Sequence, residues 1–121
     1  MKFEDLEIYK LSREISGDAW EIYKNFEWET RKVIGDQFIR SIDSIGANIA
    51  EGCGRFHYLD RNKFNYNARG SLVESIHWIE LLVERGIIKK EEGDALKNKM
   101  EILHHKLNNY INATKEHNRD K

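Results

Sequence analysis

The 121 residues include no proline, and apolar residues recur every three or four positions along four long segments. Proline is the commonest residue to interrupt a helix, so a chain without it can form long continuous helices. Apolar residues three or four positions apart lie on one side of a helix, whereas a half-buried strand requires strict alternation. The chain is therefore predicted to be all-α.

This spacing predicts four helices, at residues 6–26, 30–52, 58–85 and 89–115. We expect Thr30 to cap the second helix, and Gly52 and Gly86 to end the second and third helices in the left-handed conformation. No helix can bury its apolar stripe alone, and the short connections place consecutive helices side by side. We therefore predict an antiparallel up-down-up-down four-helix bundle. Residues 1–116 form its single domain, and residues 117–121 form a polar tail.

Composition excludes several classes of protein. The chain is 40% hydrophobic and 34% charged, which suits one small domain with one core. No apolar run approaches the roughly 20 residues of a membrane span, and the acidic N-terminal segment does not resemble a signal peptide. We therefore expect a cytoplasmic protein without membrane contact. Cys53 is the single cysteine, so neither an intrachain disulfide nor a cysteine-based metal site is expected.

Several large aromatic residues lie outside the predicted core stripes. Those that fall off the core stripes are Tyr9, Trp20, Tyr23, Trp28, Tyr66 and Trp78. Scattered surface aromatics are normal in soluble proteins, but aromatic residues are enriched at interfaces between subunits. We therefore predict a homo-oligomer.

The stretch SIGANIAEGCGRF at residues 44–56 contains a Gly-x-Gly pair that invites comparison with phosphate-binding loops. It follows a predicted helix instead of a strand, and it lacks both a third glycine and the Gly-Lys-Ser/Thr ending of a P-loop. We interpret Gly52, Gly54 and Gly70 as helix-turn glycines. No nucleotide, other cofactor or small-molecule substrate is predicted.

Two Glu-x-x-His pairs, Glu74 with His77 and Glu101 with His104, resemble the ligands of di-iron bundles. Their register places these side chains on the flanks of the helices, outside the inward stripe, so no metal site is predicted. The serines have no histidine base at a recognisable spacing, so we predict neither catalytic residues nor an enzyme. A di-metal bundle enzyme is the distant alternative.

Polar residues repeat at helical spacing beside the predicted core on the second and third helices. They are Ser44, Asn48 and Glu51 on one helix, and Asn67, Ser71 and Glu74 on the other. Because a short turn joins the two helices, we expect the two polar stripes to meet in a partly buried structural network. The alternative is that both stripes face water as ordinary solvated flanks.

Two motifs carry a family resemblance: S-I-x-x-N-I-A-E-G-x-G-R at residues 44–55 and G-S-L-x-E at residues 70–74. With Asp60, Phe64 and Ala68 between them, they resemble the signature of the bacterial 23S rRNA intervening-sequence proteins, also labelled S23. The resemblance implies an antiparallel four-helix bundle that assembles as a ring-shaped homopentamer without enzymatic activity. A related branch serves diversity-generating retroelements as an accessory protein that binds a reverse transcriptase and nucleic acid.

Basic and aromatic residues alternate after the second helix, in a chain whose net charge is only −1. They are Arg55, Phe56, His57, Tyr58, Arg61, Lys63 and Arg69, opposed only by Asp60. Arg61 and Asn62 occupy positions where the family more usually has apolar residues. We therefore expect the start of the third helix to be exposed to solvent. An aromatic and basic surface of this kind fits single-stranded RNA or DNA. The alternative is a scaffold that binds a protein partner.

Overall fold

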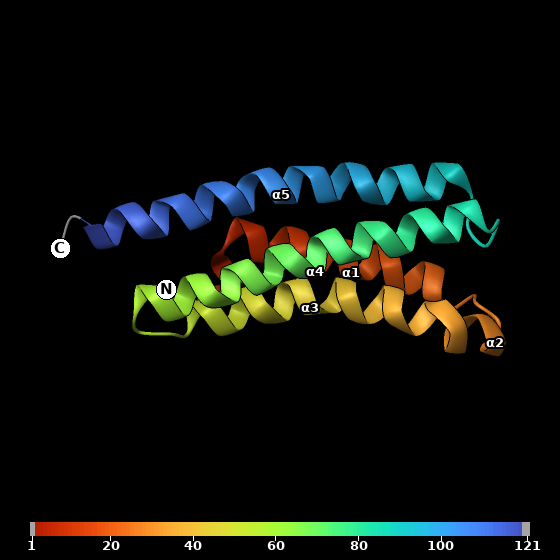
Figure 1. The fold of residues 1–121 in the computed structure, drawn as a ribbon, viewed down its shortest axis with the longest axis horizontal. Coiled ribbons are helices and arrows are strands. Elements are labelled where there is room, and N and C mark those ends of the chain that lie inside the picture. The colour runs from red at the N-terminus through yellow and green to blue at the C-terminus, as the bar shows by residue number, and fades with distance from the viewer. Residues whose placement is uncertain (1, 120–121) are drawn as a thin grey trace.

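The computed structural model describes residues 2–119, and side chains as far as Glu116. A short 3-10 turn, η1, at Phe3–Asp5 precedes α1 at Glu7–Tyr23. The next helical stretch comprises α2 at Trp28–Thr30, a π-helical turn, η2, at Arg31–Gly35, and α3 at Asp36–Cys53. Two longer helices follow, α4 at Tyr58–Glu84 and α5 at Lys90–Arg119. Residues 2–119 contain no strand, and the prediction of an all-α four-helix bundle is confirmed (Figure 1).

Two hydrogen bonds show the direction in which α3 and α4 run relative to each other. Ser41 of α3 pairs with Ser75 of α4, while Ser44 pairs with Ser71, so one residue number rises as the other falls. The colours of Figure 1 follow the same alternation along all four long helices. The α3–α4 turn lies at one end of the elongated bundle, and α2 lies at the opposite end with the α4–α5 connection.

The predicted apolar stripes of all four long helices converge on one core. Its largest fully buried side chains are Phe38, Ile15, Ile34, Ile42, Ile45, Ile49, Leu72, Ile79, Leu82, Met100, Leu103 and Leu107. These residues recur every three or four positions on their helices, so each helix turns one side inward and leaves the rest exposed.

The second helix begins earlier than predicted, which corrects the role of Thr30. Helical backbone starts at Trp28, after Glu27, and Thr30 has helical angles (φ −63°, ψ −41°) without a capping hydrogen bond. The π-helical turn that follows brings Gly35 against Phe26, where a Cβ would come within 2.8 Å of the ring. The ring of Phe26 therefore occupies the space beside this turn, and Thr30 lies inside the helix.

The glycines of the motif are also placed differently from the prediction. Gly52 is buried inside the last turn of α3, so it is not the left-handed cap that was predicted. Gly54 lies in the turn directly after α3, as predicted, with right-handed angles (φ −79°, ψ −7°). Gly70 lies in the interior of α4 and not at a helix turn. Among the described residues, only Gly86 has a positive φ, of 70°, and it follows the end of α4 as predicted.

Gly52 has a different physical role, which is to permit close packing. A Cβ at this position would lie 3.0 Å from the carbonyl oxygen of Arg61 and 3.1 Å from Cβ of Phe64. The helix α3 therefore needs glycine here because α4 begins immediately against it. At the far end of the chain, α5 continues to Arg119 through part of the predicted polar tail, and residues 120–121 lie outside the described residues.

Candidate functional site

The α3–α4 turn presents an apolar side chain to solvent at one end of the bundle. Residues 54–57 connect the helices, and His57 is the N-cap of α4 with extended angles and no side-chain cap hydrogen bond. The ring of Phe56 is 90% exposed and touches the imidazole of His57 edge-on, with 5.2 Å between ring centroids. Phe56 is not part of the core, so its side chain adds little to the stability of the fold.

Arg55 lies beside this exposed ring but is already engaged within the chain. Its guanidinium forms an ion pair with the carboxylate of Glu51, one helical turn earlier. It also lies over the ring of Phe64, 4.7 Å from the centroid. The pair is half exposed, so solvent screens it and a phosphate can compete for the guanidinium.

Arg61 and Arg69 turn away from the exposed tip toward α5. Nε of Arg61 is buried and has no hydrogen-bond partner among the described residues. Arg69 donates a hydrogen bond of 2.9 Å to Oδ1 of Asn108, and its guanidinium lies 5.1 Å from the ring centroid of Tyr66. The structure therefore divides the predicted basic surface into an outward part at the tip and an inward part along α5.

Two further members of the predicted surface differ in exposure. Lys63 is exposed on the outer side of α4, whereas Tyr58 is half-buried at the start of that helix. Asn62 was expected to be exposed to solvent, but only 4% of its surface is exposed. That expectation is therefore wrong. Its amide donates to the carbonyl oxygen of Ile111 at 3.3 Å and accepts from Asn65 at 2.9 Å.

Arg61 also contributes to the electrostatics beside α5. Burial raises the pKa of the Tyr110 hydroxyl, and the neighbouring Cys53 raises it further. The positive charge of Arg61 acts in the opposite direction on that pKa. Because Nε of Arg61 is buried and its charge acts on Tyr110 of α5, we exclude Arg61 from the outward binding surface.

The structure brings part of the predicted polar network together. Oγ of Ser44 and Oγ of Ser71 are 3.0 Å apart, and the amide of Asn48 donates to both the carbonyl and the hydroxyl oxygen of Ser44. The outer members, Glu51, Asn67 and Glu74, are exposed. Glu74 accepts a hydrogen bond of 2.9 Å from the indole of Trp78 on its own helix.

The network extends to a buried pair of serines that sequence reasoning missed. The hydroxyl of Ser75 donates to Oγ of Ser41 at 3.0 Å, and both residues are at most 5% exposed. One sequence feature could have predicted this pair: Ser75 falls on the apolar stripe of its helix. A small hydroxyl at such a position indicates a close helix contact.

Neither a metal cluster nor a membrane-spanning helix is found in the described part of the chain. Residues 2–119 contain no group of three or more histidine, cysteine, aspartate or glutamate side chains placed to hold a metal ion. Of the four residues in the Glu-x-x-His pairs, Glu74, His77 and Glu101 are exposed. Over the same residues, no helix is both long enough and apolar enough to cross a bilayer.

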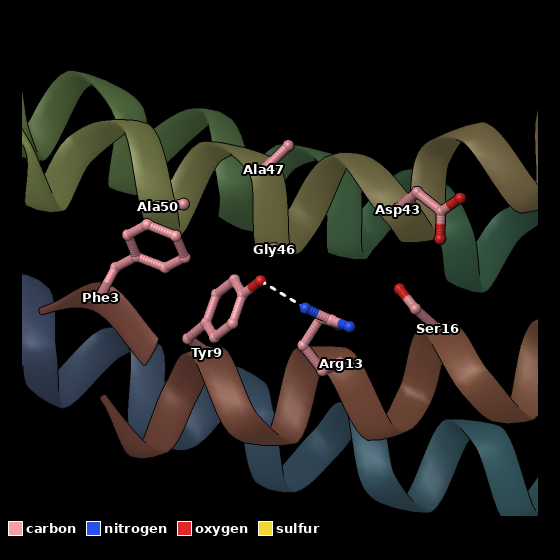
Figure 2. Close-up of a pocket in the computed structure, with 8 residues that line it drawn as sticks. All are labelled: Phe3, Tyr9, Arg13, Ser16, Asp43, Gly46, Ala47 and Ala50. Carbon is pink, nitrogen blue, oxygen red and sulfur yellow. Dashed lines mark hydrogen bonds between the residues drawn. The ribbon is translucent and has the colours of Figure 1, made fainter. Parts of the chain in front are cut away.

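A groove between α1 and α3, with a volume of about 330 Å³, is a second surface feature (Figure 2). Its lining residues are Phe3, Tyr9, Arg13, Ser16, Asp43, Gly46, Ala47 and Ala50. The small residues Gly46, Ala47 and Ala50 of α3 leave space for the groove. Within it, Arg13 donates a hydrogen bond of 2.8 Å to the hydroxyl of Tyr9.

With the fold and these surfaces established, comparison identifies the family. The model of the 23S rRNA-intervening sequence protein family matches residues 4–109. The chain belongs to this family. The resemblance based on the motifs at residues 44–55 and 70–74 is thereby confirmed.

A solved structure from the same group is similar along nearly its whole length. It is the crystal structure of a protein with unknown function from the S23 ribosomal protein family of Bacteroides thetaiotaomicron VPI-5482. Its TM-score is 0.79 at 27% sequence identity, and the match covers 86% of this chain and 97% of the other. Comparison with curated proteins gave no match.

Proposed function

We propose that this chain is a non-enzymatic, oligomeric adaptor that binds single-stranded nucleic acid through the α3–α4 turn. The observation that carries the proposal is the ring of Phe56, 90% exposed at the tip of the bundle. Any of the bases can stack on an exposed aromatic ring. In proteins that bind single-stranded nucleic acid, this stacking contributes about 1–3 kcal/mol per base.

The charges around the ring support a nucleic-acid partner. Among the exposed residues between positions 54 and 63, Arg55 and Lys63 are basic and Asp60 is acidic. Arg55 and Lys63 are exposed near the turn, where they can contact the phosphates on either side of a stacked base.

Oligomerisation makes this small surface useful. One aromatic ring and two cations give weak binding, but several copies on one assembly raise the effective concentration of sites along a strand. The family resemblance implies a homopentameric ring, and cyclic symmetry would place every α3–α4 turn on one rim. We therefore propose that the strand contacts the rim.

Binding of a fluorescently labelled single-stranded RNA, measured by anisotropy at several salt concentrations, tests the proposal. We expect Phe56→Ala and Arg55→Glu each to weaken binding at least tenfold, and affinity to fall steeply with salt. The matched controls lie at the opposite end of the bundle: Trp28→Ala removes an aromatic ring that is 71% exposed, and Lys89→Glu reverses an exposed charge. Equal effects of the control and test variants would contradict the proposal.

A protein-interaction scaffold is the second candidate. It is favoured by the exposed Trp28 and Val33, each 71% exposed at the end that carries α2. If the oligomer binds neither RNA nor DNA at low salt, this candidate replaces the first. Loss of a co-purifying protein on Trp28→Ala, with the oligomer intact, would then identify that end as the contact.

A further inference from the structure

Two facing segments of α4 and α5, on the side of the α3–α4 turn, contain no acidic residue. The chain has 21 aspartates and glutamates, yet none lies in residues 61–73 of α4 or in residues 102–115 of α5. The helices lie side by side, and the hydrogen bond from Arg69 to Asn108 joins these two segments (Figure 1). Their lysines and arginines are Arg61, Lys63, Arg69, Lys106 and Lys115.

Most of these cations lack a carboxylate partner within the described chain. Lys106 pairs with Glu7 of α1. In contrast, Lys63, Arg69 and Lys115 form no ion pair with any carboxylate among the described side chains. Like charges that are held near one another repel, so this arrangement favours the binding of an anion.

The ring of Tyr66 brings two of the cations together. The guanidinium carbon of Arg69 lies 5.1 Å from the ring centroid, and Nζ of Lys115 lies 5.6 Å from it. The electron-rich face of an aromatic ring attracts cations, which offsets part of their mutual repulsion. Arg69 uses one of its N–H groups for Asn108, and a guanidinium has five such donors.

This cluster is accessible to a large partner. Tyr66 is 39% exposed, and Lys115 is exposed on α5. Four residues after Tyr66, an added Cβ at Gly70 would meet no atom within 4 Å, so no side chain of the described chain covers the surface there. We call Tyr66, Arg69 and Lys115 the α4–α5 basic cluster.

The position of the cluster connects it with the exposed ring of Phe56. The helix α4 begins at Tyr58, so Tyr66 lies about 12 Å along its axis at about 1.5 Å per residue. Stacked nucleotides of one strand are about 3.4 Å apart, so about four of them cover this distance. Lys63 is exposed between the two places. Farther along, the acid-free segment of α4 ends at the exposed Glu74.

We infer that the α4–α5 basic cluster binds phosphate groups of single-stranded nucleic acid, as a second contact for the strand that meets Phe56. The inference rests on the proposed function, because the partner is the same strand. The two contacts differ in chemistry: Phe56 offers a ring for stacking, whereas Arg69 and Lys115 offer charge to the backbone. The cluster therefore adds affinity without selecting a base.

The salt dependence of RNA binding separates these two contacts. The logarithm of affinity falls with the logarithm of salt concentration, with a slope of about 0.7 for each phosphate that a protein neutralises on a single strand. Measured by anisotropy, Lys115→Gln should therefore reduce the steepness of the slope by about 0.7. Phe56→Ala should weaken binding at every salt concentration and leave the slope unchanged.

Two further variants complete the comparison. Tyr66→Leu should weaken binding, because the ring no longer holds the two cations together. The matched control is Lys10→Gln, which removes an exposed charge on α1, a helix that packs against α3 and α5. This control should keep the wild-type slope. Circular dichroism of each variant must match the wild type, which separates a lost contact from lost folding.

The possible results separate this inference from the proposed function. A wild-type chain that binds neither RNA nor DNA at low salt would overturn both. A wild-type slope in Lys115→Gln, together with weakened binding in Phe56→Ala, would overturn the inference alone. A reduced slope in Lys115→Gln, with wild-type affinity in Phe56→Ala, would support the cluster and contradict the contact at the turn. Labelled poly-glutamate that binds as tightly as RNA, and more weakly to Lys115→Gln, would indicate an acidic protein partner and overturn the inference.

Discussion

At the scale of single residues, Gly86, Gly52 and Gly54 show how one residue type serves different purposes. Gly86 adopts a positive φ that other residues avoid, so its role is conformational. Gly52 has ordinary helical angles, but the backbone of α4 lies against its missing side chain. Gly54 has neither constraint, since its nearest neighbour would lie 3.6 Å from an added Cβ. The sequence shows three glycines, and only the packing distinguishes them.

Substitution of two neighbouring glycines by alanine should therefore have opposite effects on stability. We expect Gly52→Ala to lower the free energy of unfolding by about 1–3 kcal/mol, because its methyl group would press on the backbone of Arg61. Gly54→Ala should raise it by about 0.4–1 kcal/mol, because alanine restricts the unfolded chain and fits the right-handed angles found here. Urea unfolding of both variants and the wild type measures the differences. A destabilising Gly54→Ala would contradict the assigned geometry.

At the scale of elements, ion pairs join α1 to α5 along the edge of the core. Lys99 donates to Asp18 and lies 3.5 Å from Glu14, and Lys106 contacts Glu7 at 2.8 Å. The hydrogen bond that Lys99 donates to Asp18 raises the pKa of Lys99 above its ordinary value. The hydrogen bond from Lys106 lowers the pKa of Glu7 below its ordinary value. Both shifts show that the charged forms are the ones the folded chain favours.

The lowered pKa of Glu7 predicts a specific pH dependence of stability. A carboxylate with a depressed pKa stabilises the fold above its ordinary pKa of 4.5, and that contribution is lost as pH falls through the lowered folded value. We expect Glu7→Gln to reduce the urea midpoint slightly at pH 7 and to have no effect at the acid end of the series. The control Glu4→Gln changes an exposed carboxylate in the preceding turn. A Glu7→Gln effect that stays constant with pH would argue against the ion pair.

At the scale of the whole molecule, four helices share one core, while large apolar side chains also lie at the surface. Leu103 is fully buried, and its neighbour in sequence, Ile102, is 51% exposed. Exposed side chains such as Ile102 and Val73 add little to the stability of the single chain. Their contribution to the single chain is therefore expected to be much smaller than that of the buried core residues.

The shared core predicts a contrast between these adjacent positions of α5. Leu103→Ala should lower the free energy of unfolding by about 2–5 kcal/mol, because it leaves a cavity among side chains from the surrounding helices. Ile102→Ala should change it by no more than about 0.5 kcal/mol. Thermal unfolding followed by circular dichroism provides the comparison. Similar losses at both positions would contradict the exposed position of Ile102.

The sequence by itself determined the four long helices, their inward stripes and the family, because helical periodicity and short motifs are local properties. Only the tertiary structure decided that Gly52 packs against α4, that Arg61 and Arg69 turn toward α5 while Phe56 faces solvent, and that Asn62 is buried. Periodicity places residues on a face of a helix, but it does not say which neighbouring helix covers that face or how closely. Burial and pairing depend on those distances, and they decide which charges and rings are left for a partner.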